Sequence, residues 1–286
     1  MGRVQDKVVF ITGVARGQGR AHAVRLAGEG ANIVGIDALE DVATVPYPMG
    51  TDDDLEETRD LISAAGGKHH LVKADVRDTQ AIADAVRDGA ELFGGGLDGV
   101  VAQAGVMAVG NKDPQSFHDT LDINLGGVLN TVSATYSHLR DGASIVITGS
   151  YAAFTSAMKA DPNGGAGGLG YVASKRLLAA YTHDLALAMA PRRIRANAVH
   201  PTSVDTTMMR NDAIYRSFRP DLESPTFEDA LPALPVLNLF PDPWIDVSDV
   251  AHAVVYLLSD ESRAVTGTQM RVDLGAWIKL HDYQSP

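Results

Sequence analysis

Tyr171 and Lys175, four positions apart in the string YVASK, are the residues best suited to chemistry. Side chains four residues apart lie on one face of a helix. A free tyrosine has a pKa of about 10 and is a poor base at neutral pH, but a neighbouring cation favours the phenolate and lowers that pKa. The pair therefore predicts a general acid and base for proton transfer. Taken alone, it is more typical of an exposed Tyr and Lys on a surface helix.

Two polar residues upstream could complete such a centre. Ser150 follows the strand-like string SIVIT, and ligands of open α/β sheets bind at the carboxyl ends of strands. Its hydroxyl could hold a substrate oxygen, or it could be a turn former. Asn124 lies in a preceding helical stretch. It could anchor a water molecule that relays protons from Lys175, or it could be a buried polar group of the helix.

A glycine-rich turn near the N-terminus predicts a dinucleotide site. The string TGVARGQG, residues 12–19, lies between a strand-like and a helical segment. That order lets the backbone approach a pyrophosphate at the N-terminus of a helix. An isolated string of this kind would equally suit an ordinary turn. The residues of the turn expected to contact the cofactor are Gly13, Arg16, Gly17, Gln18 and Gly19.

An acidic residue at the end of the second strand indicates which dinucleotide is bound. Asp37 comes about 20 residues after the glycines, where a carboxylate binds the ribose hydroxyls of the adenosine. The same carboxylate would repel a 2′-phosphate, so NAD is favoured over NADP. Arg16 could attract that phosphate, but Asp37 occupies the position where the ribose is recognised. Asp37 could alternatively cap the turn that follows its strand.

Further candidates follow the third and fourth strands. Asp75, followed by Val76, could bind the adenine amino group or cap the helix that begins near Thr79. Ala104 and Gly105 would let the backbone pass close to the cofactor, because they are small.

Strands and helices alternate along the chain and would position all these residues. The expected strands are 7–12, 31–37, 68–74, 97–102, 144–148, 194–199 and 270–274, and the helical stretches include 20–28, 79–93, 116–139, 171–190 and 247–258. This alternation predicts a parallel sheet with helices on both faces. The sequence has no internal repeat and no linker, so we expect one domain over residues 1–286.

Three long segments interrupt the alternation. We expect a loop near 38–55, because it contains two prolines, and a looped-out glycine-rich insertion over 151–170. The segment 205–245 could form an apolar lid over a substrate, or its side chains could be core or subunit contacts. The lid candidates are Met208, Met209, Tyr215, Phe218, Phe227 and Trp244.

Composition limits the class of protein. The 286 residues carry a formal net charge of -12, with no long basic run, which argues against nucleic acid and anionic membrane as partners. The absence of cysteine excludes disulfides, thiolate zinc sites and a cysteine nucleophile. We expect a cytoplasmic protein, because there is no signal-like N-terminus or long apolar run. We expect no metal site, because His69 and His70 are adjacent rather than helically spaced.

The chain resembles the short-chain dehydrogenase/reductase family from about Gly2 to Trp277. The motifs that carry the resemblance are TGVARGQG, Asp37, Asp75, AQAG, Asn124, Ser150, YVASK and the string HPTSVDT at residues 200–206. The resemblance implies a Rossmann-type fold of about seven parallel strands, usually as a homotetramer. It also implies hydride transfer between a secondary alcohol and NAD.

The family's catalytic tetrad would be Asn124, Ser150, Tyr171 and Lys175. Tyr171 would take the hydroxyl proton, and Lys175 would also bind the ribose hydroxyls. In the segment that begins at Pro201, the backbone of Val204 and the hydroxyl of Thr206 would bind the nicotinamide carboxamide.

Two departures from the family pattern stand out. Gln103 replaces the usual asparagine after the fourth strand, so we expect local hydrogen bonds to be rearranged. Ser150 and Tyr171 are 21 positions apart, more than is usual in the family, which makes Ser150 the less secure of the two assignments.

The insertion VPYPMGTDDDLEET after Asp37 resembles the mycofactocin-associated, carveol-dehydrogenase-like branch. That resemblance implies NAD held so firmly that it exchanges poorly, a redox partner that reoxidises bound NADH, and a medium-sized, terpenoid-like alcohol as substrate. Two alternatives are a non-catalytic dinucleotide-binding regulator and a metal-dependent hydrolase. The first would need only the glycine turn and Asp37.

Overall fold

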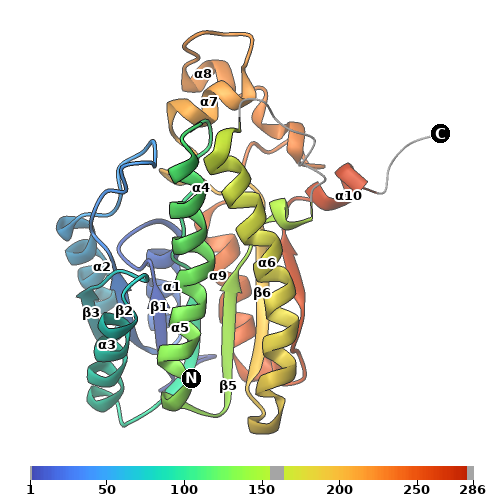
Figure 1. Ribbon diagram of the computed structural model, residues 1–286. Coiled ribbons are helices and arrows are strands. Elements are labelled where there is room, and N and C mark those ends of the chain that lie inside the picture. The colour runs from blue at the N-terminus through green and yellow to red at the C-terminus, as the bar shows by residue number, and fades with distance from the viewer. Residues whose placement is uncertain (1, 155–163, 282–286) are drawn as a thin grey trace.

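Seven parallel strands form one sheet at the centre of the protein (Figure 1). The structure is a computed structural model that describes residues 2–154 and 164–281. The strands lie in the order β3-β2-β1-β4-β5-β6-β7. Their bounds are β1 Val8–Thr12, β2 Asn32–Asp37, β3 His69–Lys73, β4 Leu97–Ala102, β5 Leu139–Thr148, β6 Arg195–Pro201 and β7 Gln269–Val272. The predicted α/β fold with a Rossmann-type sheet is confirmed.

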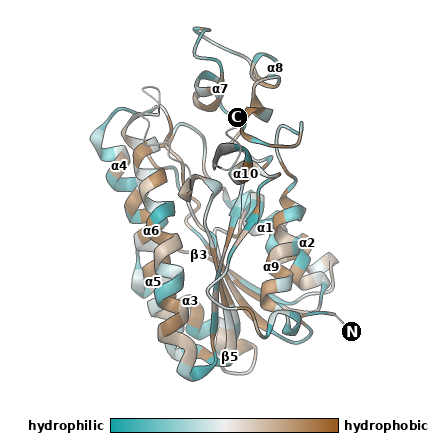
Figure 2. Ribbon diagram, turned by 90° about the vertical axis from the view of Figure 1, so that its right-hand side faces the viewer, coloured by the Kyte–Doolittle hydropathy of each residue, from teal (hydrophilic) through white to brown (hydrophobic). Residues whose placement is uncertain are grey.

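Helices cover both faces of the sheet (Figure 2). One face carries α3 (Thr79–Leu92), α4 (Pro114–Leu121), α5 (Gly127–Thr135) and α6 (Gly165–Met189), and the other carries α1 (Gly17–Gly28), α2 (Asp52–Ala64) and α9 (Val247–Leu258). Alternate residues of β1 enter two separate cores: Val8 and Phe10 join one, Val9 and Ile11 the other. The strand is therefore a continuous apolar run, as expected for a parallel strand covered on both sides.

The order of the strands reverses at β1, which pairs with β2 on one side and β4 on the other. Such a switch point opens a crevice at the carboxyl ends of the strands. Three short helices stand above this edge: α7 (Asp212–Phe218), α8 (Phe227–Ala230) and α10 (Ala276–His281) (Figure 1). None of the helices in the described ranges has the length and apolarity needed to cross a membrane.

The helix predicted over 116–139 is present over 116–138, but it is not a regular α-helix throughout. It is divided into α4, a π-helical turn over Asp122–Gly126, and α5, and β5 already begins at Leu139. The π turn carries Asn124, whose side-chain amide bonds the backbone of Val106 in both directions, at 2.8 and 2.9 Å. Single π turns of this kind are frequent at functional sites.

The predicted loop over 151–170 was wrong at its end, because residues 165–170 are the first turns of α6. These residues are helical because their glycines pack closely against the backbone of a neighbouring segment. A Cβ added at Gly167 would lie 2.1 Å from the carbonyl oxygen of Ala108, and one at Gly165 would lie 2.2 Å from that of Asn111. Glycines there allow a helix to pack directly on another backbone. Residues 155–163 of the predicted insertion lie outside the described residues.

The segments near 38–55 and 205–245 also contain helical structure. Helix α2 begins at Asp52 because Thr51 and Asp54 form a capping box, so the loop ends four residues before the predicted boundary. The second segment folds into α7, α8 and a 3₁₀ turn over Leu234–Leu237.

Candidate active site

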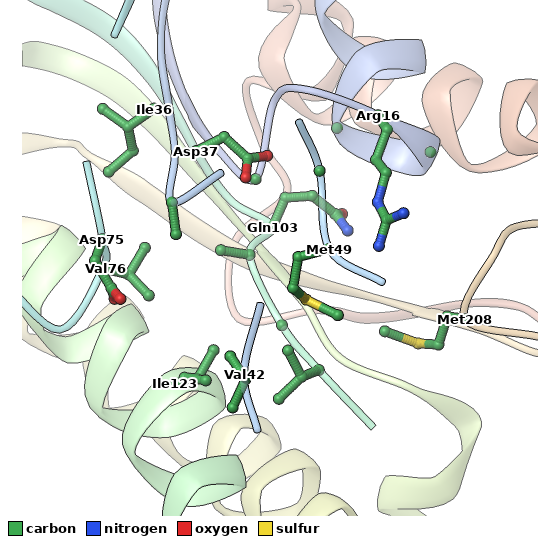
Figure 3. Close-up of a pocket in the computed structure, with 18 of the residues that line it drawn as sticks. Arg16, Ile36, Asp37, Val42, Met49, Asp75, Val76, Gln103, Ile123 and Met208 are labelled. Atoms are coloured by element: carbon green, nitrogen blue, oxygen red, sulfur yellow. The ribbon is translucent and has the colours of Figure 1, made fainter. Parts of the chain in front are cut away.

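Two adjoining cavities open at the carboxyl edge of the sheet. The first, of about 160 Å³, lies between the glycine turn and the ends of β2, β3 and β4 (Figure 3). The second, of about 570 Å³, lies over β5, β6 and the N-terminal turns of α6. The residues that line both cavities are Gln18, Gln103, Gly105, Thr206 and Met208. A single elongated ligand could therefore extend from one cavity into the other.

The glycine turn forms one wall of the first cavity and depends on its glycines. Gly13 and Gly17 have φ of 72° and 55°, which favour glycine. A Cβ at Gly19 would lie 1.9 Å from the carbonyl oxygen of Gly13. No side chain caps the N-terminus of α1, which follows Arg16. Its backbone N–H groups are available to an anion such as a pyrophosphate.

Asp37 lines the same cavity and lies beside the glycine turn (Figure 3). Its carboxylate accepts hydrogen bonds from the backbone of Ala15 at 2.9 Å and of Leu39 at 3.4 Å. Burial raises the pKa of Asp37, and these bonds and Arg16 oppose the rise. The Arg16 guanidinium donates to the carbonyl of Pro48 in the insertion. Arg16 is thus engaged by the protein itself.

Asp75 is held by a neighbouring arginine. The Arg77 guanidinium donates to both carboxylate oxygens at 2.5–3.1 Å, and the Arg77 backbone N–H donates at 2.8 Å. Desolvation raises the pKa of Asp75, but the bonds to Arg77 outweigh it and the net pKa is lowered. The carboxylate lines the first cavity, and the helix beginning at Thr79 is capped by Asp78 instead.

Gln18, which lines both cavities, has a buried oxygen that bears on whether a dinucleotide fits the site. The Oε1 atom of Gln18 is buried without a hydrogen-bond partner among the described residues. Buried polar atoms are almost always satisfied in native proteins. An amide donor of a ligand lying across both cavities would satisfy this oxygen, so the residues present fit a nicotinamide dinucleotide.

Tyr171, Lys175 and Ser150 meet in the second cavity. The Lys175 ammonium donates to the carbonyl of Thr148 at 2.8 Å and lies 5.6 Å from the centroid of the Tyr171 ring. Burial lowers the pKa of Lys175 to about 8. Helix α6 presents both side chains to the end of β5, where Ser150 follows the strand.

The pKa of Tyr171 departs from the sequence expectation. Burial raises it, and a hydrogen bond with the Ser150 side chain opposes the rise. The predicted lowering by Lys175 is not seen, because desolvation of the phenolate is the largest effect. The group that opposes the rise in the pKa of Tyr171 is Ser150. Ser150 had been the less secure candidate because it lies 21 positions from Tyr171 in the sequence.

Asn124 is buried beside these groups rather than in either cavity wall. Its amide nitrogen donates to the Val106 carbonyl and, at 3.3 Å, to the Ser174 hydroxyl. A Cβ placed on Gly105 would lie 3.2 Å from the Asn124 Oδ1 and 3.7 Å from the Lys175 Nζ. Both polar groups therefore approach the same point of the backbone.

Gln103 hydrogen-bonds to groups on two neighbouring elements. Its Oε1 accepts from the Thr148 hydroxyl at 2.6 Å and lies 3.2 Å from the Nε2 of buried His22. Burial lowers the pKa of His22 to about 4, so the ring is neutral. Gln103 thus ties β4 to the end of β5 and to α1.

Two tyrosines at the site were not predicted. Tyr47, in the insertion, accepts a hydrogen bond from the Met107 backbone at 3.0 Å. Tyr151, next to Ser150, lines the second cavity. Burial raises the pKa of both phenols, and each interacts electrostatically with Tyr171. An aromatic residue between two prolines was the available signal for Tyr47.

The segment 205–245 is divided between the two roles predicted for it. Met208, Met209 and Phe218 line the second cavity. Phe227 and Trp244 instead stack on each other, with ring centroids 5.5 Å apart and the Arg210 guanidinium over both rings. Tyr215 packs against Phe227. The lid interpretation thus applies to three of its six residues.

The predicted cofactor residues all lie in a cavity wall. The first cavity is lined by Gly13, Arg16, Gly17, Gly19, Asp37, Asp75, Val76 and Ala104, the second by Tyr171, Lys175, Pro201 and Val204, and both by Gln18, Gly105 and Thr206. Over residues 2–154 and 164–281, no group of three or more His, Asp or Glu residues is arranged to hold a metal ion.

Comparison with known proteins identifies the family. The profile described as Enoyl-(Acyl carrier protein) reductase matches residues 13–276. The (-)-trans-carveol dehydrogenase of Rhodococcus erythropolis is 39% identical, over 98% of this chain and 100% of its own. The chain belongs to the short-chain dehydrogenase/reductase family. The predicted oxidoreductase class is confirmed.

Solved structures of this family agree with the fold. The carveol dehydrogenase of Mycobacterium avium, in complex with NAD, superposes with a TM-score of 0.90 at 43% identity, covering 97% of this chain and 100% of that one. A short-chain dehydrogenase of Mycobacterium paratuberculosis bound to NAD gives a TM-score of 0.85 at 36% identity, covering 96% and 99%. The resemblance to carveol-dehydrogenase-like enzymes is confirmed.

Proposed function

We propose that the protein is an NAD-dependent dehydrogenase that interconverts a secondary alcohol and a ketone, with Tyr171 as its general acid and base. The convergence of Tyr171, Lys175 and Ser150 in one cavity, adjoining the glycine turn, carries this proposal. NAD is the cofactor, since Asp37 faces the first cavity while Arg16 is engaged by Pro48. The NAD-bound relatives support the same cofactor.

The residues divide the chemistry among them. A bound NAD would supply the acceptor for the hydride of the carbinol carbon. Ser150 holds the substrate oxygen, and Tyr171 takes the hydroxyl proton during oxidation or returns it during reduction. Lys175 binds the ribose hydroxyls and passes protons toward Asn124. The pyrophosphate belongs at the N-terminus of α1, and the carboxamide at the Val204 backbone and the Thr206 hydroxyl.

The raised pKa of Tyr171 fixes the sign of the pH dependence. A phenol with a raised pKa is protonated at neutral pH and is ready to act as an acid, which suits reduction. Oxidation needs the phenolate, whose fraction grows as pH increases. We therefore expect oxidative kcat to rise with pH into the alkaline range. A flat profile with chemistry shown to be rate-limiting would contradict this role.

The substrate proposed for the second cavity is a medium-sized, neutral and largely apolar alcohol, terpenoid-like in size and polarity. Lys175 is the one charged side chain among the described residues that line this cavity. Met107, Leu169, Met209 and Phe218 supply apolar surface around it. The carveol dehydrogenases among the relatives agree with this class of substrate.

Replacement of one phenol tests the catalytic assignment. Tyr171→Phe removes the proton-transfer group and keeps the ring, so kcat should fall by about 10²- to 10⁴-fold. Tyr181→Phe is the matched control, since that phenol lies on the same helix and outside both cavities. NADH binding by both variants should remain. A Tyr171→Phe enzyme with normal turnover would sink the proposal, and NADH binding without turnover in the wild type would favour the non-catalytic regulator.

A strap formed by the insertion supports slow cofactor release. The carbonyl of Thr44 accepts from the Asn111 side chain at 2.8 Å, and the Thr44 hydroxyl donates to Asp119 at 2.6 Å. Together with the hydrogen bond between Tyr47 and Met107, these contacts hold the insertion against the first cavity. A redox partner that reoxidises bound NADH completes this proposal.

Native mass spectrometry can measure the effect of the strap. Purified protein should carry NAD that is lost on denaturation, and Tyr47→Phe should exchange it several-fold faster. Because the phenylalanine cannot accept the bond from Met107, the strap loses one anchor. Equal exchange rates in wild type and variant would contradict the strap's role.

The oligomer we propose is a homotetramer. Leu129, Tyr136, Leu177 and Leu187, on or beside α5 and α6, are exposed by 41–76%. Exposed apolar side chains on helices that cover one face of the sheet are typical of subunit contacts. Leu187→Glu should reduce the mass measured by light scattering, and an unchanged mass would argue against this interface.

A further inference from the structure

His200, the residue before the last of β6, is buried beside Ser150 and has no role in the mechanism above. Its Nδ1 lies 3.1 Å from the backbone nitrogen of Ser150, and its Nε2 lies 2.7 Å from the Oε1 of Gln269. The ring also covers Gly149, where an added Cβ would lie 2.3 Å from it. On another side, Phe154 packs against it with centroids 4.7 Å apart.

The hydrogen bonds around Gln269 assign the tautomer of this histidine. The Gln269 amide nitrogen donates to the carbonyl of Ala179 in α6 at 3.0 Å, so its oxygen faces His200. An oxygen there can only accept, and His200 must therefore carry its proton on Nε2. The unprotonated Nδ1 is then the acceptor for the Ser150 N–H.

We propose that His200, held in this tautomer by Gln269, is a positioning residue that fixes the backbone at Ser150 and thereby aims the Ser150 hydroxyl. Ser150 has an extended backbone, φ −167° and ψ 154°, at the start of a 3₁₀ turn over Tyr151–Ala153. The relay ties this turn to β6, β7 and α6, the helix that carries Tyr171. The inference rests on the proposed function, since it requires Ser150 to orient the substrate oxygen.

The surroundings of His200 keep it neutral. Burial is the main effect that lowers its pKa, and the cations Lys175 on α6 and Arg271 on β7 lower it further, while the bonds to Gln269 and Ser150 oppose them. Protonation would place a hydrogen on Nδ1. The ring would then donate to the Ser150 carbonyl, 3.0 Å away, and could no longer accept from the Ser150 N–H.

Two substitutions separate positioning from packing. His200→Leu fills the space without an acceptor, so kcat should fall by about tenfold to a hundredfold with KM within about threefold. His200→Asn places an oxygen where Nδ1 stands and should keep kcat within about threefold of wild type. Asn197→Leu is the matched control: this buried β6 residue bonds Val265 and Thr268 and does not touch Ser150. It should lower Tm and leave kcat nearly unchanged.

A double-mutant cycle distinguishes this inference from the proposed function. Ser150→Ala alone tests whether Ser150 contributes to turnover, and normal turnover would remove that assignment. If Ser150→Ala is impaired, adding His200→Leu should cost nothing more, because both act through one hydroxyl. The inference is overturned if His200→Leu is as active as wild type, if His200→Asn is as poor as His200→Leu, or if the two losses multiply.

A pH profile gives a readout that does not depend on the leucine variant folding. In the reductive direction, wild-type kcat should decline on the acid side, below the ordinary histidine pKa of about 6.5, as His200 is protonated. His200→Asn has no such group and should lack that decline. Superimposable profiles would overturn the inference.

Discussion

The two cavities at the carboxyl edge are built in different ways. The cofactor cavity is formed largely by the backbone of short turns. These turns need glycine where a side chain would collide with the backbone, as at Gly19. Side chains from distant segments form the substrate cavity, including Met107, Phe218 and Leu169. A turn whose backbone is closely packed tolerates almost no added atoms, whereas the apolar side chains of a cavity wall can be replaced one at a time. We therefore expect substitutions in the first cavity to abolish binding and those in the second to redirect it.

The largest effect should come from the glycine turn. Gly19→Ala places a Cβ against the Gly13 carbonyl oxygen, so the turn must open and NADH affinity should fall by about a hundredfold or more. Titration of NADH fluorescence measures this. Gly28→Ala is the control on the same helix, because nothing lies within 4 Å of its added Cβ. Equal NADH affinity in both variants would break the contrast between the cavities.

A smaller effect is expected where the first cavity uses a side chain. Asp37→Asn removes the charge and keeps an acceptor for the Ala15 N–H. Because charge-assisted hydrogen bonds contribute about 1.5–3 kcal/mol, kcat/KM for NAD should fall roughly tenfold to a hundredfold, while NADP improves. Asp75→Asn is the comparison, since its carboxylate is engaged by Arg77, and should affect both cofactors alike. An unchanged NAD-to-NADP ratio in Asp37→Asn would contradict ribose recognition by Asp37.

The contrast between local backbone turns and side chains from distant segments also explains what could be predicted from the sequence. The strands, the glycine turn and the residues at strand ends follow from short-range patterns. Each predicted strand is present, although β5 begins at Leu139, five residues before its predicted start. The glycines over 165–170 read as a loop because glycine disfavours helices. Only their contacts with Ala108 and Asn111, more than 50 residues away in sequence, explain the helix there. Likewise, the two prolines of the string VPYP single out Tyr47, but they do not indicate that it reaches Met107, 60 residues away.

The smallest effect should lie in the substrate cavity, where two phenylalanines of one segment differ in place. Phe218 lines the cavity, whereas Phe227 stacks on Trp244 beneath Arg210. Phe218→Ala should lower kcat/KM for a bulky alcohol such as cyclohexanol by about tenfold and for 2-propanol much less, since apolar contacts are lost only to the larger substrate. Phe227→Ala should lower Tm by several degrees with the cyclohexanol-to-2-propanol ratio unchanged. If both variants shift that ratio equally, the whole segment acts as one lid. If neither does, the size selectivity is set by other residues of the cavity wall, such as Met107 and Leu169.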